Sequence, residues 1–64
     1  MSENDVVQFN ENHKWAGCFG IITKVKKCED GISYLVRVPI APDLVTSIYA
    51  TDEEIEYIGK AILV

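Results

Sequence analysis

Apolar and β-branched residues occur along the chain in short runs that are separated by turn-forming residues. The first run covers residues 6–9, and the second covers residues 21–28. Residues 10–20 lie between them and hold two glycines among polar side chains, so we expect a long loop there. The pair Asp30-Gly31 follows the second run and suits a tight hairpin turn. The chain therefore begins with strand, loop, strand and hairpin.

The third run, residues 32–40, alternates between two kinds of side chain. Tyr34, Val36 and Val38 occupy every second position, and the positions between them are mixed in character. Since successive side chains of a strand point to opposite faces, this pattern predicts a strand with one apolar face. We expect that face to point into the core.

Two prolines end this pattern. Pro39 and Pro42 lack the N–H that a sheet ladder needs, and each restricts the residue before it. We therefore expect a loop of several residues beginning at residues 41–43, followed by a short fourth strand over residues 46–50.

A capping box predicts one helical turn after the fourth strand. In residues 51–54, Thr51 can accept a bond from a backbone N–H while Glu54 reaches back to the start of the turn. Ile55 and Ile58 are three residues apart, so we expect both to cover one end of the core. Gly59 is placed to end the turn.

The last apolar run, residues 60–64, predicts a fifth strand. A chain of 64 residues can build only one thin core, so we expect a single domain over residues 1–64 with residues 1–4 disordered. Five short strands with one helical turn before the last predict a mainly β fold, a five-stranded SH3-like barrel. The expected core consists of Val7, Phe9, Ile22, Val25, Val36 and Ile55.

The formal net charge of −4 is unevenly distributed along the chain. Lys24, Lys26 and Lys27 form the only basic cluster, with Arg37 expected beside it on the next strand. Because Lys and Arg supply most of the affinity for phosphates, an acidic chain is a poor generic nucleic-acid binder. No apolar run reaches the length of a membrane span, and the first residues are acidic. We expect a cytoplasmic protein with no membrane contact.

Two segments resemble those of a known fold family. Residues 17–25 (GCFGIITKV), preceded by Val7 and Phe9, resemble the KOW-type opening of SH3-like barrels, in which a Gly-x-x-Gly turn leads into a strand. Residues 51–59 (TDEEIEYIG) resemble the turn before the last strand of the same fold. The chain is similar to small uncharacterised barrel proteins of bacteriophages and prophages of Gram-positive bacteria. This resemblance implies a fold and no established activity.

The residues that could carry chemistry are few. His13 and Cys18 share one loop but lack an orienting third group, so we expect no enzyme. With Cys28 they lack the paired spacing and four ligands of a zinc site, so we expect no metal and no cofactor. Both cysteines are expected to be reduced thiols.

Two surfaces are candidates for binding. Trp15 is the only tryptophan, and it is either a lid packed over one end of the core or an aromatic anchor for a partner. On the second interpretation the chain is a non-catalytic protein-interaction module of unknown specific role, and the interaction residues are Trp15, His13, Phe19, Tyr49 and Tyr57.

The alternative function is a nucleic-acid-binding accessory protein that uses the lysine-rich strand. Its residues are Lys24, Lys26, Lys27 and Arg37. The simpler interpretation of those lysines is a solvated strand face or a protected sheet edge. The acidic residues of the helical turn have two interpretations. They stabilise the N-terminus of the turn through its dipole, or they form an acidic patch that docks a basic partner or a second copy. A homodimer and a role in virion assembly both stay open.

Overall fold

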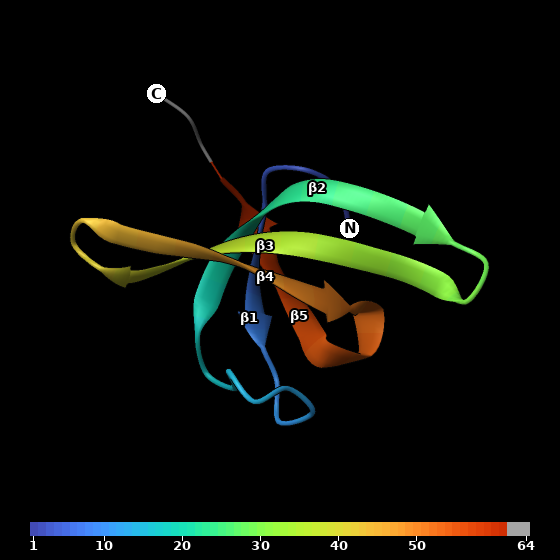
Figure 1. The fold of residues 1–64 in the computed structure, drawn as a ribbon, viewed down its shortest axis with the longest axis horizontal. Coiled ribbons are helices and arrows are strands. Elements are labelled where there is room, and N and C mark those ends of the chain that lie inside the picture. Colours follow the sequence, from blue (N-terminus) through green and yellow to red (C-terminus); the bar gives the residue numbers. More distant parts are fainter. Residues whose placement is uncertain (62–64) are drawn as a thin grey trace.

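The computed structural model describes residues 1–61 and contains one antiparallel sheet of five strands (Figure 1). The strands follow the order β4-β3-β2-β1-β5, so β4 and β5 are the two edges. Among the described residues β4 and β5 do not pair, and the sheet stays open. The predicted mainly β class is confirmed, whereas closure into a barrel is not seen. The strands are β1 (Asp5–Phe9), β2 (Phe19–Cys28), β3 (Gly31–Ala41), β4 (Leu44–Thr51) and β5 (Ile55–Lys60), and a 3-10 turn, η1 (Asp52–Glu54), precedes β5.

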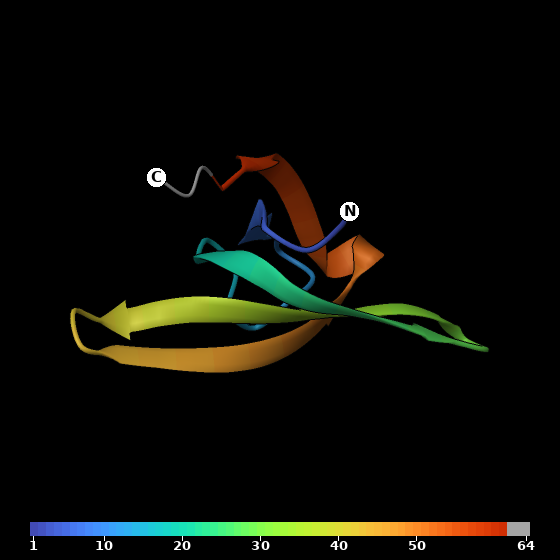
Figure 2. The ribbon, with the colours of Figure 1, turned by 90° about the horizontal axis from the view of Figure 1, so that it is seen from above.

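The sheet is strongly twisted. β2, β3 and β4 form a long ribbon with a hairpin at each end, and Figure 2 shows β1 and β5 folded over one side of that ribbon. The core lies between the two parts. Its buried side chains include Tyr34, Val36 and Val38, as the alternating pattern predicts. Of the six residues expected in the core, five are fully buried, and Val25 is half-buried against them. The buried set is Val7, Phe9, Ile22, Tyr34, Val36, Val38, Ala50 and Ile55.

The turn between β2 and β3 confirms the expected hairpin. Gly31 has a φ of +135°, a conformation that residues with a Cβ rarely adopt. The preceding loop is shorter than predicted, because β2 begins at Phe19 instead of residue 21. β1 accounts for this extension, since Gln8 pairs with Phe19 and Val7 pairs with Gly20.

The connection between β3 and β4 differs from the expected loop of several residues. β3 continues to Ala41, and β4 begins at Leu44 instead of residue 46, so the turn is only two residues long. Pro39 is tolerated inside β3 because of where its missing N–H points. The β2–β3 pairing ends at Ile21 and Arg37, two residues short of Pro39. Backbone N–H groups of an antiparallel strand point alternately to its two neighbours, so an N–H at residue 39 would point toward the β2 side of β3. β2 no longer pairs with β3 at that position, so the proline removes no bond of the sheet.

The segment after β4 also corrects the prediction. Glu54 accepts bonds from the Thr51 backbone N–H (2.9 Å) and hydroxyl (3.2 Å), so the short turn forms as the capping pattern predicts. Ile55 is buried, but Ile58 is 52% exposed and does not cover the core. Gly59 does not end the turn, because it lies inside β5.

Pairing with β1 explains these differences. β5 pairs with β1 directly after the three-residue turn, so residues 55–60 form the last described strand. The sequence predicts the fifth strand at residues 60–64, and residues 62–64 lie outside the described part. Val6 pairs with Gly59 while Val7 pairs with Tyr57. Ile58 is the extra residue of this bulge, which leaves it at the surface.

Candidate interaction face

The loop that carries Trp15 is a compact series of turns. The backbone N–H groups of His13, Ala16 and Cys18 donate to carbonyls three residues earlier, at 3.0–3.1 Å. The Gly17 N–H donates to the Phe9 carbonyl at 2.8 Å, which ties the loop to the end of β1. Trp15 is half-buried and packs against the core. This packing is what the lid interpretation of Trp15 requires, and its role as a partner anchor stays a prediction.

His13 connects this loop to the edge strand β4. The Trp15 backbone N–H donates to His13 Nδ1 at 3.1 Å, so the neutral ring carries its proton on Nε2. That nitrogen lies 3.4 Å from the Tyr49 carbonyl oxygen and donates to it. The ring also lies 4.5 Å from the Phe9 ring, centroid to centroid. His13 is therefore engaged within the protein.

The side of β2, β3 and β4 that faces away from the core, which we call the outer face, brings several apolar side chains together. In the strand register, Val6, Ile21 and Arg37 lie in one row. Pro39 pairs with Val45 beside that row. A groove of about 460 Å³ runs between them. It is lined by Val6, Phe19, Gly20, Ile21, Arg37, Pro39 and Val45.

The outer face is basic although the chain is acidic. β2, β3 and β4 contain Lys24, Lys26, Lys27 and Arg37 but no Asp or Glu, so all ten acidic residues lie elsewhere. Lys24 pairs with Leu35 and Lys26 pairs with Ser33, on the same side as Arg37. Lys27 pairs with Ile32, which packs against the core, so it lies on the opposite side. Three of the four predicted basic residues therefore share one face.

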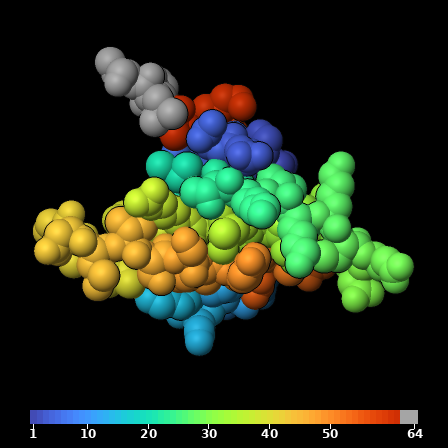
Figure 3. All heavy atoms as spheres, turned by 45° about the horizontal axis from the view of Figure 1, so that its top comes forward, coloured from blue at the N-terminus to red at the C-terminus, as the bar shows by residue number. Residues whose placement is uncertain are grey.

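The five predicted interaction residues do not form one cluster. Phe19 and Tyr49 both lie on the outer face, 52% and 64% exposed, but toward its opposite ends. Tyr57 is 53% exposed on β5, the other edge of the sheet. Figure 3 shows β2, β3 and β4 as one continuous surface with the hairpin tips projecting at its two ends. The structure thus distributes the candidates over a loop, a face and an edge.

The apolar residues of the groove are not among the residues predicted from the sequence. Ile21, Pro39 and Val45 are unremarkable as single residues, and only the strand register aligns them. Alternation in β3 was the available signal, because a strand with a buried face also defines an exposed one. Locating the neighbours on β2 and β4 requires the pairing itself.

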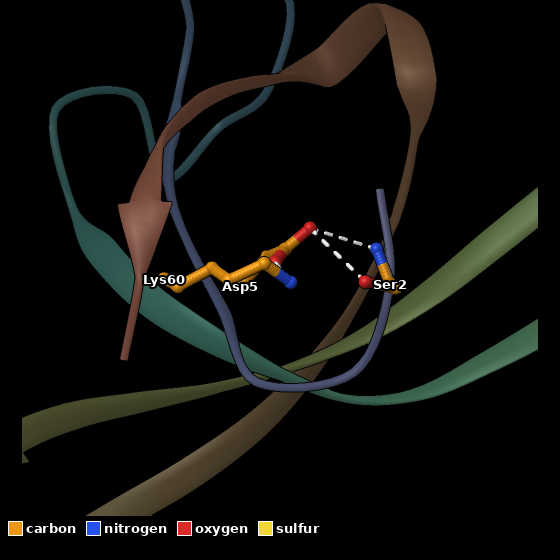
Figure 4. Close-up of polar contacts among 3 residues, drawn as sticks. All are labelled: Ser2, Asp5 and Lys60. Carbon is orange, nitrogen blue, oxygen red and sulfur yellow. Dashed lines mark hydrogen bonds and ion pairs between the residues drawn. The ribbon is translucent and has the colours of Figure 1, made fainter. Parts of the chain in front are cut away.

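A buried carboxylate lies near the N-terminus (Figure 4). The Asp5 side chain is buried, with 4% of the residue exposed. Its Oδ2 accepts a hydrogen bond from the Ser2 backbone N–H at 2.8 Å, and its Oδ1 lies 3.5 Å from Lys60 Nζ. The Ser2 N–H bond and the Lys60 charge hold the pKa of Asp5 below its ordinary value, against the effect of burial. Asp5 is thus an ionised clamp between the N-terminal segment and β5. Asn4 adds to this clamp, because it donates to the Ile22 carbonyl and accepts from the Ala61 N–H, both at 2.8 Å.

Three further observations concern metal ligands, thiols and membrane-spanning helices in the described part of the chain. Over residues 1–61 no three His, Cys, Asp or Glu side chains gather as a metal site requires. Cys18 and Cys28 are free thiols. No helix within those residues is long and apolar enough to cross a membrane.

Comparison with known proteins gives no relative from which a function could be transferred: no protein-family model matches the chain, and neither a curated protein nor a solved structure is significantly similar to it.

Proposed function

We propose that the protein is a non-catalytic protein-interaction module that binds its partner through the outer face. The observation that carries this proposal is the combination of an apolar groove with Arg37, Lys24 and Lys26 on three strands that contain no acid. Protein interfaces have an apolar centre, and arginine and aromatic residues are enriched in them. The exposed Phe19 at the groove supplies the aromatic component.

The fold class and location belong to the same proposal. The strand order, with β1 between β2 and β5, and the short turn before β5 support an SH3-like arrangement. The resemblance of residues 17–25 and 51–59 supports kinship with phage and prophage barrel proteins. Free cysteines suit a reducing compartment, so we propose a cytoplasmic protein.

Affinity capture from the native cell tests the outer face. Phe19→Thr combined with Val45→Thr removes apolar surface from the groove while keeping residues suited to strands. Tyr57→Thr is the matched control, since Tyr57 is as exposed as Phe19 but lies on β5. We expect the double variant to lose the captured partner and the control to retain it. Equal recovery with wild type, double variant and control would remove the outer face as the binding surface.

Trp15→Ala belongs in the same experiment. The loop hypothesis predicts loss of the partner with this variant while the groove variant retains it. Because Trp15 packs against the core, a thermal melt must accompany the capture. Loss of binding by a fully folded Trp15→Ala protein would move the site to the loop.

Single-stranded nucleic acid is a second candidate partner. Tyr49 stands highly exposed in a groove that also contains Lys24 and Lys26. Exposed aromatic rings that stack on bases, next to cations that contact phosphates, are typical of single-strand binding. The net charge of −4 disfavours nucleic-acid binding, whereas the concentration of bases without acids on β2, β3 and β4 favours it.

A salt titration of labelled oligonucleotide binding separates the two candidates. Lys24→Glu with Lys26→Glu reverses two charges on the outer face, and Lys27→Glu reverses one charge on the opposite side. Nucleic-acid binding predicts a steep loss of affinity with salt, and a loss with the double variant that Lys27→Glu does not share. Tight binding of this kind would replace the protein-interaction proposal.

A further inference from the structure

The two edges of the sheet are protected to different degrees. β5 has six residues, includes the charged Glu56 and Lys60, and is interrupted by the bulge opposite Val6 and Val7. β4 has eight residues, LVTSIYAT, with no charge, proline or glycine. Charges, short length and bulges are the features by which proteins prevent strands from adding to a sheet edge. β5 has all three features. β4 is longer and uncharged, and the one irregularity in its pairing with β3 is confined to its first residues, where Ile40 of β3 is left unpaired between Pro39 and Ala41.

The backbone of β4 faces outward at alternate residues. The Thr23 hydroxyl of β2 donates to the Leu35 carbonyl at 3.2 Å, so the Leu35 backbone points toward β2. Leu35 pairs with Tyr49, whose carbonyl therefore points away from β3 and receives the His13 ring. Since these directions alternate along an antiparallel strand, the N–H and C=O groups of Val45 and Ser47 also face the free edge. These groups can pair with an added strand.

Arg37 determines which side chain suits such a strand. An added strand would lie about 4.8 Å beyond β4, with alternate side chains on the outer face beside Val45, Ser47 and Tyr49. Arg37 lines the groove and pairs with Ser47, whose short side chain would let an extended Arg37 side chain cross β4. Within residues 1–61 Arg37 forms no ion pair. A carboxylate opposite Ser47 would supply the missing partner.

We propose that the free edge of β4 takes up an extended segment of a partner protein that carries a carboxylate opposite Ser47 and apolar side chains two residues to either side. This inference rests on the proposed protein-interaction function and specifies the partner's chemistry. Strand addition combines main-chain bonds, which give affinity, with side-chain contacts, which give specificity. A second copy fits less well, because antiparallel pairing centred on Ser47 directs both Arg37 side chains toward one axis and brings Asp43 near Asp52 of the other copy.

Three capped peptides test the proposal. The first, TVTDTVT, places a carboxylate between two valines on the same face; the second, TVTKTVT, replaces the carboxylate by an amine; the third is the first with the central amide N-methylated. Binding is measured by fluorescence anisotropy, and amide shifts are followed by NMR. The N-methyl peptide removes a backbone donor without changing the protein, so its result does not depend on how a variant folds.

We expect TVTDTVT to bind about two- to five-fold more tightly than TVTKTVT, the strength of an exposed ion pair. The net charge of −4 predicts the opposite order, which makes the comparison decisive. N-methylation should weaken binding at least about tenfold, and amide shifts should centre on Val45 and Ser47. Arg37→Gln, at an exposed position, should abolish the preference for the acidic peptide.

Any of four results would overturn the proposal: no binding of TVTDTVT, equal binding of the N-methylated peptide, a preference for TVTKTVT, or a sedimenting dimer whose β4 edge excludes peptide. If the peptides fail while partner capture still depends on Phe19 and Val45, the edge inference falls and the outer-face function stands. If capture shows no dependence on the outer face but the peptides behave as expected, the outer-face function falls and the edge site stands alone.

Discussion

Replacing Gly20 by alanine tests how closely β2 and β3 approach each other beneath the outer face. A Cβ on Gly20 would collide with Val36 Cγ1 and would lie 2.8 Å from the Arg37 carbonyl oxygen and 3.1 Å from Val38 Cγ2. Two of these contacts involve buried core side chains, and the third involves backbone within the sheet. Overpacking of this kind typically costs about 1–3 kcal/mol, and a backbone contact cannot be relieved by a rotamer change, so we expect about 2–3 kcal/mol.

That loss is large for a domain of this size, because a core this small rarely supplies more than about 3–5 kcal/mol. It corresponds to a Tm roughly 10–20 °C lower. Thermal and urea unfolding followed by circular dichroism would measure it. Gly59→Ala is the matched control, because nothing lies within 4 Å of its added Cβ and we expect stability at or slightly above wild type. A Gly20→Ala protein as stable as the Gly59→Ala protein would refute the close approach of β2 and β3.

Three further predictions concern polar contacts. Glu54→Ala removes both bonds to Thr51 and should lower the free energy of unfolding by about 0.5–1.5 kcal/mol in urea titrations. The Asp52 carboxylate and burial raise the pKa of Tyr34 to about 12. The protonated hydroxyl therefore contributes its full stabilisation of the fold below pH 10 and loses it as the pH rises toward 12. Tyr34→Phe should flatten this decline of the unfolding free energy at alkaline pH. Because the pKa of Asp5 is lowered in the folded protein, its carboxylate stabilises the fold fully at pH values above the ordinary pKa of 3.8, and this stabilisation is lost as the pH falls through the folded-state pKa. Asp5→Asn should therefore flatten the decline of the unfolding free energy at acid pH. An acid decline identical to that of the wild type would contradict the clamp.

Local signals in the sequence predicted the β2–β3 hairpin and the apolar face of β3 better than the ends of strands. The Asp30-Gly31 turn and the inward face of Tyr34, Val36 and Val38 depend on neighbours along the chain, and both are confirmed. β5 could not be located in this way. Its residues follow the capping box at residues 51–54 and place Ile55 and Ile58 at helical spacing, and only pairing with β1, about 50 residues away in sequence, makes them a strand.

The candidate site shows the same limit. Counting charges along the chain indicates an acidic protein, whereas β2, β3 and β4 contain bases and no acid, and only the folded sheet brings Lys24, Lys26 and Arg37 onto one face. The Lys27 side chain illustrates the point, because a bulge between Ile22 and Lys24 sets which lysines face outward. No pattern in the sequence alone predicts that bulge.

The pairing of β1 with β5 also determines when the fold can be completed during protein synthesis. β2, β3 and β4 are joined by short hairpins and can pair as soon as they leave the ribosome. Phe9, however, lies opposite Ile55, so the core stays open on one side until β5 emerges. We therefore expect a chain stalled before residue 55 to expose Phe9 and Val7, and to be a better substrate for chaperones and proteases than the finished protein.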